Sequence, residues 1–130
     1  MARILYLDDE EAIVLLMTRM LEILGHHAAG YTRALDALAA FRKDSASFDL
    51  VITDLSMPGI TGLEFAQQIH AIRSDTAVAI ASGHVDPHDV ETALAQGLLA
   101  IVLKPQTIEE MSRTVTGLLE KSSAVTTADQ

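Results

Sequence analysis

Residues 48–62 read FDLVITDLSMPGITG and join a predicted strand, a carboxylate and a turn in one short stretch. Val51 and Ile52 belong to an apolar run of the β-branched kind that is typical of strands buried on both faces of a parallel sheet. The run ends at Asp54, and Pro58 and Gly59 then favour a turn. Open α/β sheets bind ligands at the carboxyl ends of their strands. Asp54 is therefore the first candidate functional residue.

The composition limits the classes of protein to which this chain can belong. Its 130 residues suit one domain with its own core, and 49% of them are hydrophobic. No apolar run reaches the roughly 18 to 20 residues of a membrane span, and the start leads directly into a strand pattern without a signal peptide. The absence of cysteine excludes disulfides and thiolate metal sites, and it agrees with a cytoplasmic location.

The charge of the chain points to cationic rather than anionic partners. Lys and Arg contribute 9 residues and Asp and Glu 18, which leaves a formal net charge of −9. Such a surface argues against direct binding of nucleic acid. A cationic partner or a divalent metal ion suits it better.

Short apolar runs alternate with longer stretches of helical periodicity. Strands are predicted at residues 3–7, 27–31, 50–53, 77–81 and 100–103, and helices at 11–24, 32–43, 61–73, 86–97 and from 107 onward. Five βα units predict an α/β fold, namely a flavodoxin-like, doubly wound, five-stranded parallel sheet in the order 2-1-3-4-5 with five helices. Residues 1–121 form the predicted domain, and residues 122–130 a frayed polar tail or linker.

The spacing of apolar residues also predicts which helix faces turn inward. The predicted core residues are Ile13, Leu16, Met17, Met20 and Leu24 in the first helix and Leu35, Leu38 and Phe41 in the second. Val14 and Leu15 fall outside this stripe and are candidates for a docking face. Predicted N-caps are Thr32, Thr61, Asp86 and Thr107, and Gly25 and Gly97 are predicted to close helices.

Four predicted strands end in groups that can carry chemistry. Asp8 and Asp9 follow the first strand, Asp54 the third, Ser82 the fourth and Lys104 the fifth. In a parallel sheet these ends share one edge, and the order 2-1-3-4-5 makes the first and third strands neighbours. The three carboxylates are therefore expected to meet in one crevice.

Three carboxylates in one crevice repel one another and raise each other's pKa. A hard divalent cation with oxygen ligands relieves that repulsion, and Mg²⁺ is satisfied by a few carboxylates with water and phosphate oxygens. The lack of cysteine and of histidine at these strand ends argues against zinc or copper. A metal-bound carboxylate beside Lys104 and Ser82 suits phosphoryl transfer, with Asp54 attacking phosphorus to give an aspartyl phosphate.

The chain resembles the receiver domain of the two-component response-regulator family over roughly residues 2–121. The residues that carry the resemblance are Asp8 and Asp9, Asp54, the Met57-Pro58-Gly59 turn with Gly62, Ser82, and Lys104 with Pro105. One Asp pair is a weak signal. The ordered set at the ends of four alternating strands is specific.

The resemblance implies a role for each of these positions. Asp54 would be the phosphoacceptor, and Ser82 and Lys104 would hold the phosphoryl group. Metal ligands would be Asp9 directly, Asp8 mostly through water, Asp54, and the main-chain carbonyl of Ser56. The Lys104–Pro105 peptide would be cis.

The resemblance also implies partners and a modest enzymatic activity. The phosphoryl donor would be a phosphohistidine on a histidine kinase or a histidine phosphotransfer protein, and a phosphorylation-dependent homodimer is compatible with the family. The domain would catalyse its own phosphorylation and dephosphorylation at modest rates while acting mainly as a signalling switch.

The chain departs from the family pattern at two positions near Lys104. Ile101 stands where tyrosine or phenylalanine is common, and Gln106 where an aromatic residue commonly follows Lys-Pro. An aliphatic side chain cannot move a polar ring tip between inside and outside. Two alternatives therefore stay open, a non-switching interaction module with the receiver fold and a receiver domain from a hybrid histidine kinase. A flavodoxin-like protein or Mg²⁺-dependent hydrolase is disfavoured, because no glycine-rich nucleotide loop is present.

Overall fold

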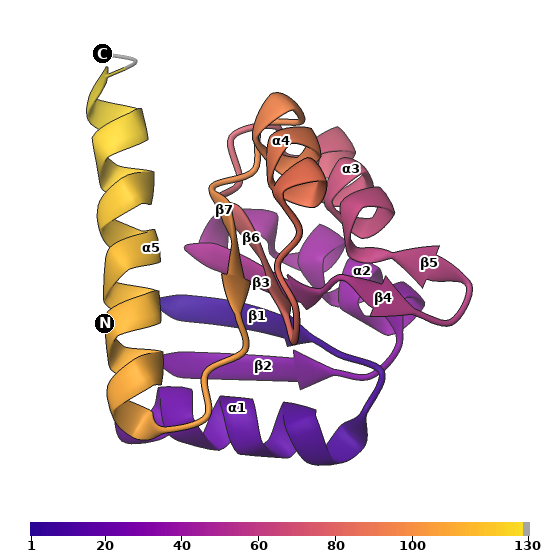
Figure 1. The fold of residues 1–130 in the computed structure, drawn as a ribbon. Coiled ribbons are helices and arrows are strands. Elements are labelled where there is room, and N and C mark those ends of the chain that lie inside the picture. Colours follow the sequence, from indigo (N-terminus) through magenta and orange to yellow (C-terminus); the bar gives the residue numbers. More distant parts are fainter. Residues whose placement is uncertain (129–130) are drawn as a thin grey trace.

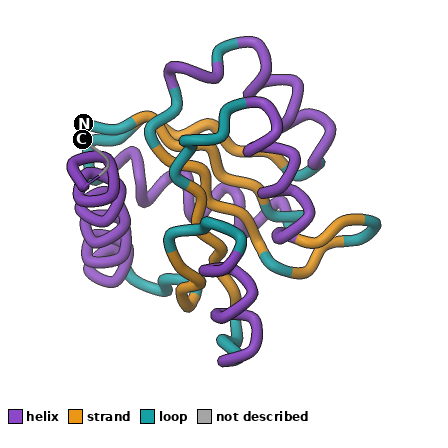
Figure 2. Tube along the Cα trace, turned by 90° about the horizontal axis from the view of Figure 1, so that it is seen from above, coloured by secondary structure: helices purple, strands orange, loops and turns teal. Residues whose placement is uncertain are grey.

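The computed structural model describes residues 1–128, which form a parallel sheet between two layers of helices (Figures 1 and 2). The strands of the main sheet are β1 (Arg3–Leu7), β2 (His27–Tyr31), β3 (Leu50–Asp54), β6 (Val78–Ser82) and β7 (Ala100–Leu103). Their order is β2-β1-β3-β6-β7, and every pair of neighbours is parallel. This is the predicted order 2-1-3-4-5, so the predicted fold class is confirmed.

Helices cover both faces of this sheet. They are α1 (Glu11–Ile23), α2 (Ala34–Lys43), α3 (Gly62–Ile72), α4 (Pro87–Ala95) and α5 (Ile108–Ala128), with a short 3₁₀ turn at Ser45–Ser47. The core has two parts, because α1 and α5 pack on one face of the sheet while α2, α3 and α4 pack on the other. Within the described residues, no helix is both long and apolar enough to cross a bilayer.

The predicted helix caps are confirmed except at Thr32. Thr61 and Glu64 form a reciprocal capping box at the start of α3, and the Asp86 carboxylate accepts the His88 N–H at the start of α4. Thr107 accepts the N–H of Glu110 at 3.1 Å. Before α2, however, Arg33 is the N-cap and offers no side-chain hydrogen bond.

The predicted inner faces of α1 and α2 were partly wrong. Leu16 is 49% exposed and Leu35 is 80% exposed, whereas Val14 is buried. Val14 packs over Gly30 of β2, where a Cβ atom would lie 2.5 Å from the Val14 Cγ1. The missing side chain of Gly30 makes room for Val14 and sets the rotation of α1. Spacing within one helix cannot reveal such a partner on a distant strand.

The chain beyond residue 121 continues as helix, contrary to the predicted frayed tail. Helix α5 extends to Ala128, and no glycine or proline follows Gly117. Propagation of an existing helix adds one hydrogen bond per residue, so small polar residues without a breaker can continue it. Residues 129 and 130 of the predicted tail lie outside the described part of the chain, and the division at residue 121 stays a prediction.

Gly62 links α3 to the end of β3 through a very close backbone approach. Its N–H donates to the Leu55 carbonyl at 2.7 Å. A Cβ atom at Gly62 would lie 2.3 Å from the backbone oxygen of Asp54. The segment between them folds back as the hairpin β4 (Ser56–Met57) and β5 (Ile60–Thr61), with Gly59 at φ +79° in its turn. Only glycine therefore fits at position 62.

We predict that Gly62→Ala lowers the free energy of unfolding by about 1–3 kcal/mol, because the added methyl group meets a backbone atom that no side-chain movement can clear. Gly117→Ala is the matched control in α5, since nothing lies within 4 Å of the place its methyl group would take. That change should raise the free energy of unfolding by about 0.5–1 kcal/mol. Urea denaturation measures both values, and equal effects of the two substitutions would contradict the steric explanation.

Candidate functional site

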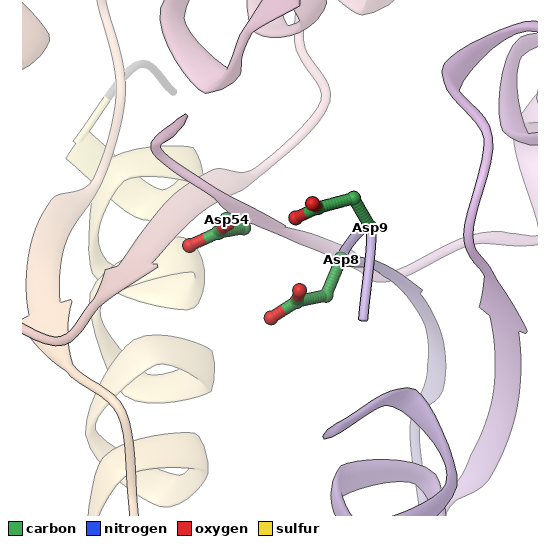
Figure 3. Close-up of side chains that lie close together, drawn as sticks. All are labelled: Asp8, Asp9 and Asp54. Atoms are coloured by element: carbon green, nitrogen blue, oxygen red, sulfur yellow. The ribbon is translucent and has the colours of Figure 1, made fainter. Parts of the chain in front are cut away.

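Three acidic side chains meet at the carboxyl edge of β1 and β3, as the strand order predicted. Leu7 pairs with Thr53 in the sheet, so Asp8 and Asp54 follow at the same level. Oxygen atoms of Asp8, Asp9 and Asp54 all lie within 4.8 Å of one another (Figure 3). This cluster of Asp8, Asp9 and Asp54 is called the acidic triad below.

Lys104 connects the fifth strand to the acidic triad. Its Nζ lies 2.8 Å from Asp8 Oδ2 and 3.1 Å from Asp54 Oδ1, and its side chain is 21% exposed. Its backbone N–H donates to the Ser82 carbonyl at 2.8 Å, which joins the end of β6 to the start of the loop after β7. One ammonium group therefore bridges carboxylates from two different strands.

The three carboxylates differ in their exposure to solvent. Asp8 is fully buried, and its Oδ1 accepts the N–H of Glu10 at 3.0 Å. Asp54 is also buried, although part of its side chain reaches the surface, and Asp9 is exposed. A cavity of about 660 Å³ opens beside Asp9, between α2 and the β4–β5 hairpin. A small cation can therefore approach the triad from solvent on the side of Asp9.

The pKa of Lys104 is shifted in the sense expected of an ion pair, whereas the pKa of Asp54 is shifted in the opposite sense. Burial raises the pKa of Asp54, and the charge of Asp8 adds to that effect, while the hydrogen bond from Lys104 opposes it without cancelling it. Burial alone would lower the pKa of Lys104, but its hydrogen bonds with Asp8 and Asp54 outweigh burial and raise that pKa. The Lys104 ammonium therefore keeps its proton, while the ionised form of Asp54 is less favoured than that of a free carboxyl group.

The acidic triad fits a divalent cation. Its ligand atoms are carboxylate oxygens at mutual distances that one small ion can span, and the donor set matches the preference of Mg²⁺. Ionised, the three carboxylates carry more negative charge than the one Lys104 ammonium beside them can neutralise. A second positive charge would stabilise the ionised carboxylates.

Ser82 lies at the end of β6, where its neighbour Ala81 pairs with Asp54 of β3. It is almost fully buried, and its Oγ accepts the N–H of His84 at 3.3 Å. The hydroxyl oxygen is thus fixed by the turn that follows the strand. Ser56 lies in β4 beyond Leu55, and the role of its carbonyl as a metal ligand stays a prediction.

The predicted cis peptide at Lys104–Pro105 was wrong, because no peptide bond is cis in the part of the chain that the structure describes. The trans form of an X–Pro bond is favoured by about 0.5–1 kcal/mol. With this peptide trans, the Lys104 ammonium already reaches both Asp8 and Asp54. Nothing in the contacts of Lys104 therefore requires the less stable isomer.

The sequence analysis named Gly62 without its steric role and missed Tyr6 altogether. Gly62 carries the close approach to Asp54, and only its place after the turn could have signalled that role. Tyr6 is buried in β1, two residues before Asp8, and its hydroxyl has no hydrogen-bond partner. The available signal was a phenol in an otherwise aliphatic strand, ILYL.

Comparison with known proteins identifies the family. The family model of the response regulator receiver domain matches residues 4–116 of the chain. The chain belongs to this family. Among solved structures, a response regulator receiver domain protein from Clostridium thermocellum is 29% identical, with a TM-score of 0.84 over 96% of this chain and 99% of that one. The chemotaxis protein CheY4 of Vibrio cholerae is 26% identical, with a TM-score of 0.82 over 91% of this receiver domain and 98% of CheY4.

Curated relatives are much longer than this receiver domain. The two-component response regulator ARR10 of Arabidopsis thaliana is 29% identical over 120 residues, which cover 92% of this chain and 22% of ARR10. The sensory/regulatory protein RpfC of Xanthomonas campestris pv. campestris strain 8004 is 33% identical over 110 residues, or 79% of this chain and 14% of RpfC. The receiver domain therefore spans less than a quarter of either relative.

We predict that Asp54→Asn raises the melting temperature of the cation-free receiver domain at neutral pH. The raised pKa means that the folded state holds a proton on Asp54 more tightly than the unfolded state does. Stability from this group is therefore present at low pH and falls as the pH rises above the usual value of 3.8. The neutral Asn side chain abolishes that fall, which thermal unfolding across the pH range measures.

Asp75→Asn is the matched control for this substitution. The Asp75 side chain is 85% exposed and pairs only with Arg73 on the surface. Exposed ion pairs contribute about 0–1 kcal/mol, so this variant should differ little from wild type. A lower melting temperature of Asp54→Asn than of wild type would mean that the Lys104 interaction outweighs burial and repulsion by Asp8.

Proposed function

We propose that this receiver domain accepts a phosphoryl group on Asp54 from a phosphohistidine of a histidine kinase or histidine phosphotransfer protein. The observation that supports the proposal is the bridge from Lys104 to Asp8 and Asp54 at the edge of the acidic triad. It combines a carboxylate nucleophile, a fixed cation and two further acids in one place.

The reaction is a phosphoryl transfer from nitrogen to oxygen. A carboxylate oxygen of Asp54 attacks phosphorus, the phosphorus–nitrogen bond breaks, and the neutral imidazole leaves with the electron pair of that bond. The resulting aspartyl phosphate is an acyl phosphate, which water later hydrolyses. Transfer of this kind needs positioning and neutralisation of charge more than covalent chemistry by the protein.

Each residue of the site has a part in this proposal. Asp9, Asp54 and the Ser56 carbonyl would hold Mg²⁺, with Asp8 acting mostly through water, and the ion would supply positive charge to the phosphoryl oxygens. Lys104 turns its ammonium from Asp54 to one phosphoryl oxygen, and the Ser82 hydroxyl donates to another. Water then hydrolyses the phosphoryl group from Asp54, which is the modest self-dephosphorylation expected from the family. Phosphorylation changes the charge at this site, and in this proposal that change acts as a signalling switch.

The identity of the partner and the assembly are also proposals. The receiver domain of NtrC4, 25% identical to this one, was solved as a beryllofluoride-activated dimer, which supports a phosphorylation-dependent homodimer here. The negative charge of −9 supports a partner with a basic docking surface and gives no support for direct contact with nucleic acid. A cytoplasmic location remains part of the proposal.

The cation part of the proposal predicts that Mg²⁺ stabilises the wild-type domain. At a concentration 100 times the dissociation constant, the gain is about 2.7 kcal/mol. Asp9→Asn should lose most of this gain, because it removes the exposed carboxylate of the triad. Asp36→Asn is the matched control, since Asp36 lines the same cavity as Asp9 but is not part of the triad. Thermal unfolding in a Mg²⁺ series measures both, and equal gains in the two variants would contradict the assignment of Asp9.

The phosphoacceptor part predicts that a small phosphodonor with Mg²⁺ labels the wild type but not Asp54→Ala. The label should be acid-stable and sensitive to hydroxylamine, as an acyl phosphate is. Lys104→Met should slow labelling about 100-fold, because one fixed charge on the phosphoryl oxygens is lost. Lys43→Met, an exposed lysine at the end of α2, is the control. Equal labelling of wild type and Asp54→Ala would remove Asp54 from the role.

A second function, that of an interaction module that does not switch, is favoured by one observation. Ile101 of β7 is buried in the apolar core, at the position where the family commonly has an aromatic ring. A phosphoryl mimic such as beryllofluoride separates the two functions. Changes in the amide NMR signals of α4 and β7 on its addition with Mg²⁺ support a switch, and unchanged signals support the interaction module.

A further inference from the structure

The hydroxyl of Tyr6 is the one buried side-chain polar atom without a hydrogen-bond partner among the described residues. Tyr6 is only 1% exposed, so solvent cannot satisfy its hydroxyl. An unpartnered buried hydroxyl is costly, and phenylalanine would fill the same space without that cost. The hydroxyl therefore needs a partner in some state of the protein.

Tyr6 lies on the same face of the sheet as the buried carboxylates. Side chains alternate along a strand, so Tyr6 and Asp8 of β1 project to one face. Tyr6 pairs with Ile52 of β3, and Ile52 shares its face with Asp54. Tyr6 and Ile52 both pack in the part of the core covered by α1 and α5. The Tyr6 side chain is therefore on the same face of the sheet as Asp8 and Asp54, within the part of the core covered by α1 and α5.

The Asp8 carboxylate accepts two hydrogen bonds from the protein. In the cation-free structure its Oδ2 accepts from Lys104 and its Oδ1 from the N–H of Glu10. Lys104 contacts oxygens of two triad members, so its ammonium competes with any divalent cation there. A cation that drew Asp8 Oδ2 away from Lys104 would leave the fully buried Asp8 carboxylate with a single hydrogen bond from the protein, that of the Glu10 N–H. The carboxylate would then need another donor.

We propose that Tyr6 is a positioning residue for the divalent-cation site, and that its hydroxyl donates to the buried Asp8 carboxylate, directly or through one water, when the cation is bound. Donors behind a metal-binding carboxylate fix its orientation and support its negative charge. A tyrosine phenol is neutral near pH 7 and can donate one O–H hydrogen bond. The proposal rests on the cation site of the proposed function, although it does not require phosphorylation.

The two tyrosines of the chain make a sharp test possible. There is no tryptophan, and the second tyrosine is Tyr31. Tyr31 lies on β2, and its side chain packs against the opposite part of the core, under α2 and α3. Tyr31→Phe therefore removes a hydroxyl on the other face of the sheet, keeps the hydrogen bond from the Asp8 N–H to the Tyr31 backbone carbonyl, and leaves Tyr6 as the sole tyrosine fluorophore. Tyr6→Phe removes the hydroxyl under test with the same chemical change.

Mg²⁺ alone is the probe, titrated by calorimetry into the wild type and both variants. Tyr6→Phe should weaken Mg²⁺ binding about 10-fold, whereas Tyr31→Phe should match the wild type. Without Mg²⁺, the melting temperature of Tyr6→Phe should be no lower than that of the wild type, because the lost hydroxyl has no partner there. In Tyr31→Phe, the emission of Tyr6 should change with Mg²⁺ and saturate at the calorimetric dissociation constant.

Several outcomes would overturn the proposal. Mg²⁺ affinity of Tyr6→Phe within twofold of wild type would do so, as would Tyr6 emission that does not respond to saturating Mg²⁺. The emission test stands even if Tyr6→Phe does not fold. Wild type that binds no Mg²⁺ would overturn both this proposal and the cation part of the proposed function. Labelling of Asp54→Ala by a phosphodonor would overturn the phosphoacceptor role alone.

Discussion

A single ammonium group holds two buried carboxylates from different strands at one edge of the sheet, and the site depends on this interaction. Lys104 reaches Asp8 and Asp54 at 2.8 and 3.1 Å. Without it, two like charges would lie side by side at low exposure, which proteins rarely tolerate. The compensation is incomplete, because the site brings together three carboxylates and one ammonium group. This residual excess of negative charge is what makes the edge receptive to a further cation.

The fold makes this arrangement rigid on the core side and open on the solvent side. Asp8 is fixed by the Glu10 N–H, and the end of β3 is clamped by α3 through the close approach of Gly62 to Asp54. Asp9 and the cavity between α2 and the β4–β5 hairpin remain accessible. Rigid carboxylates beneath an accessible one suit reversible binding of a small ion, since the ligands are preorganised and the entry path stays open.

Family membership explains the site but does not by itself explain the signal output. The family match covers residues 4–116, while the chain spans 22% of ARR10 and 14% of RpfC. Ile101 replaces the common aromatic residue and is buried in the core under α4. The backbone hydrogen bond from Lys104 to Ser82 joins the ends of β6 and β7 directly beside the site.

The sequence by itself determined the strand order, most helix caps and the meeting of four charged residues at one edge, namely Asp8, Asp9, Asp54 and Lys104. Alternating strands and helices are local patterns, and the flavodoxin-like order then brings the ends of the parallel strands together. It could not determine the rotation of α1, since Val14 is buried by the gap over Gly30, or the exposure of Leu35. It also missed the trans Lys104–Pro105 peptide and the buried Tyr6 hydroxyl. Those features depend on distances between elements remote in the chain, and only tertiary packing decides such distances.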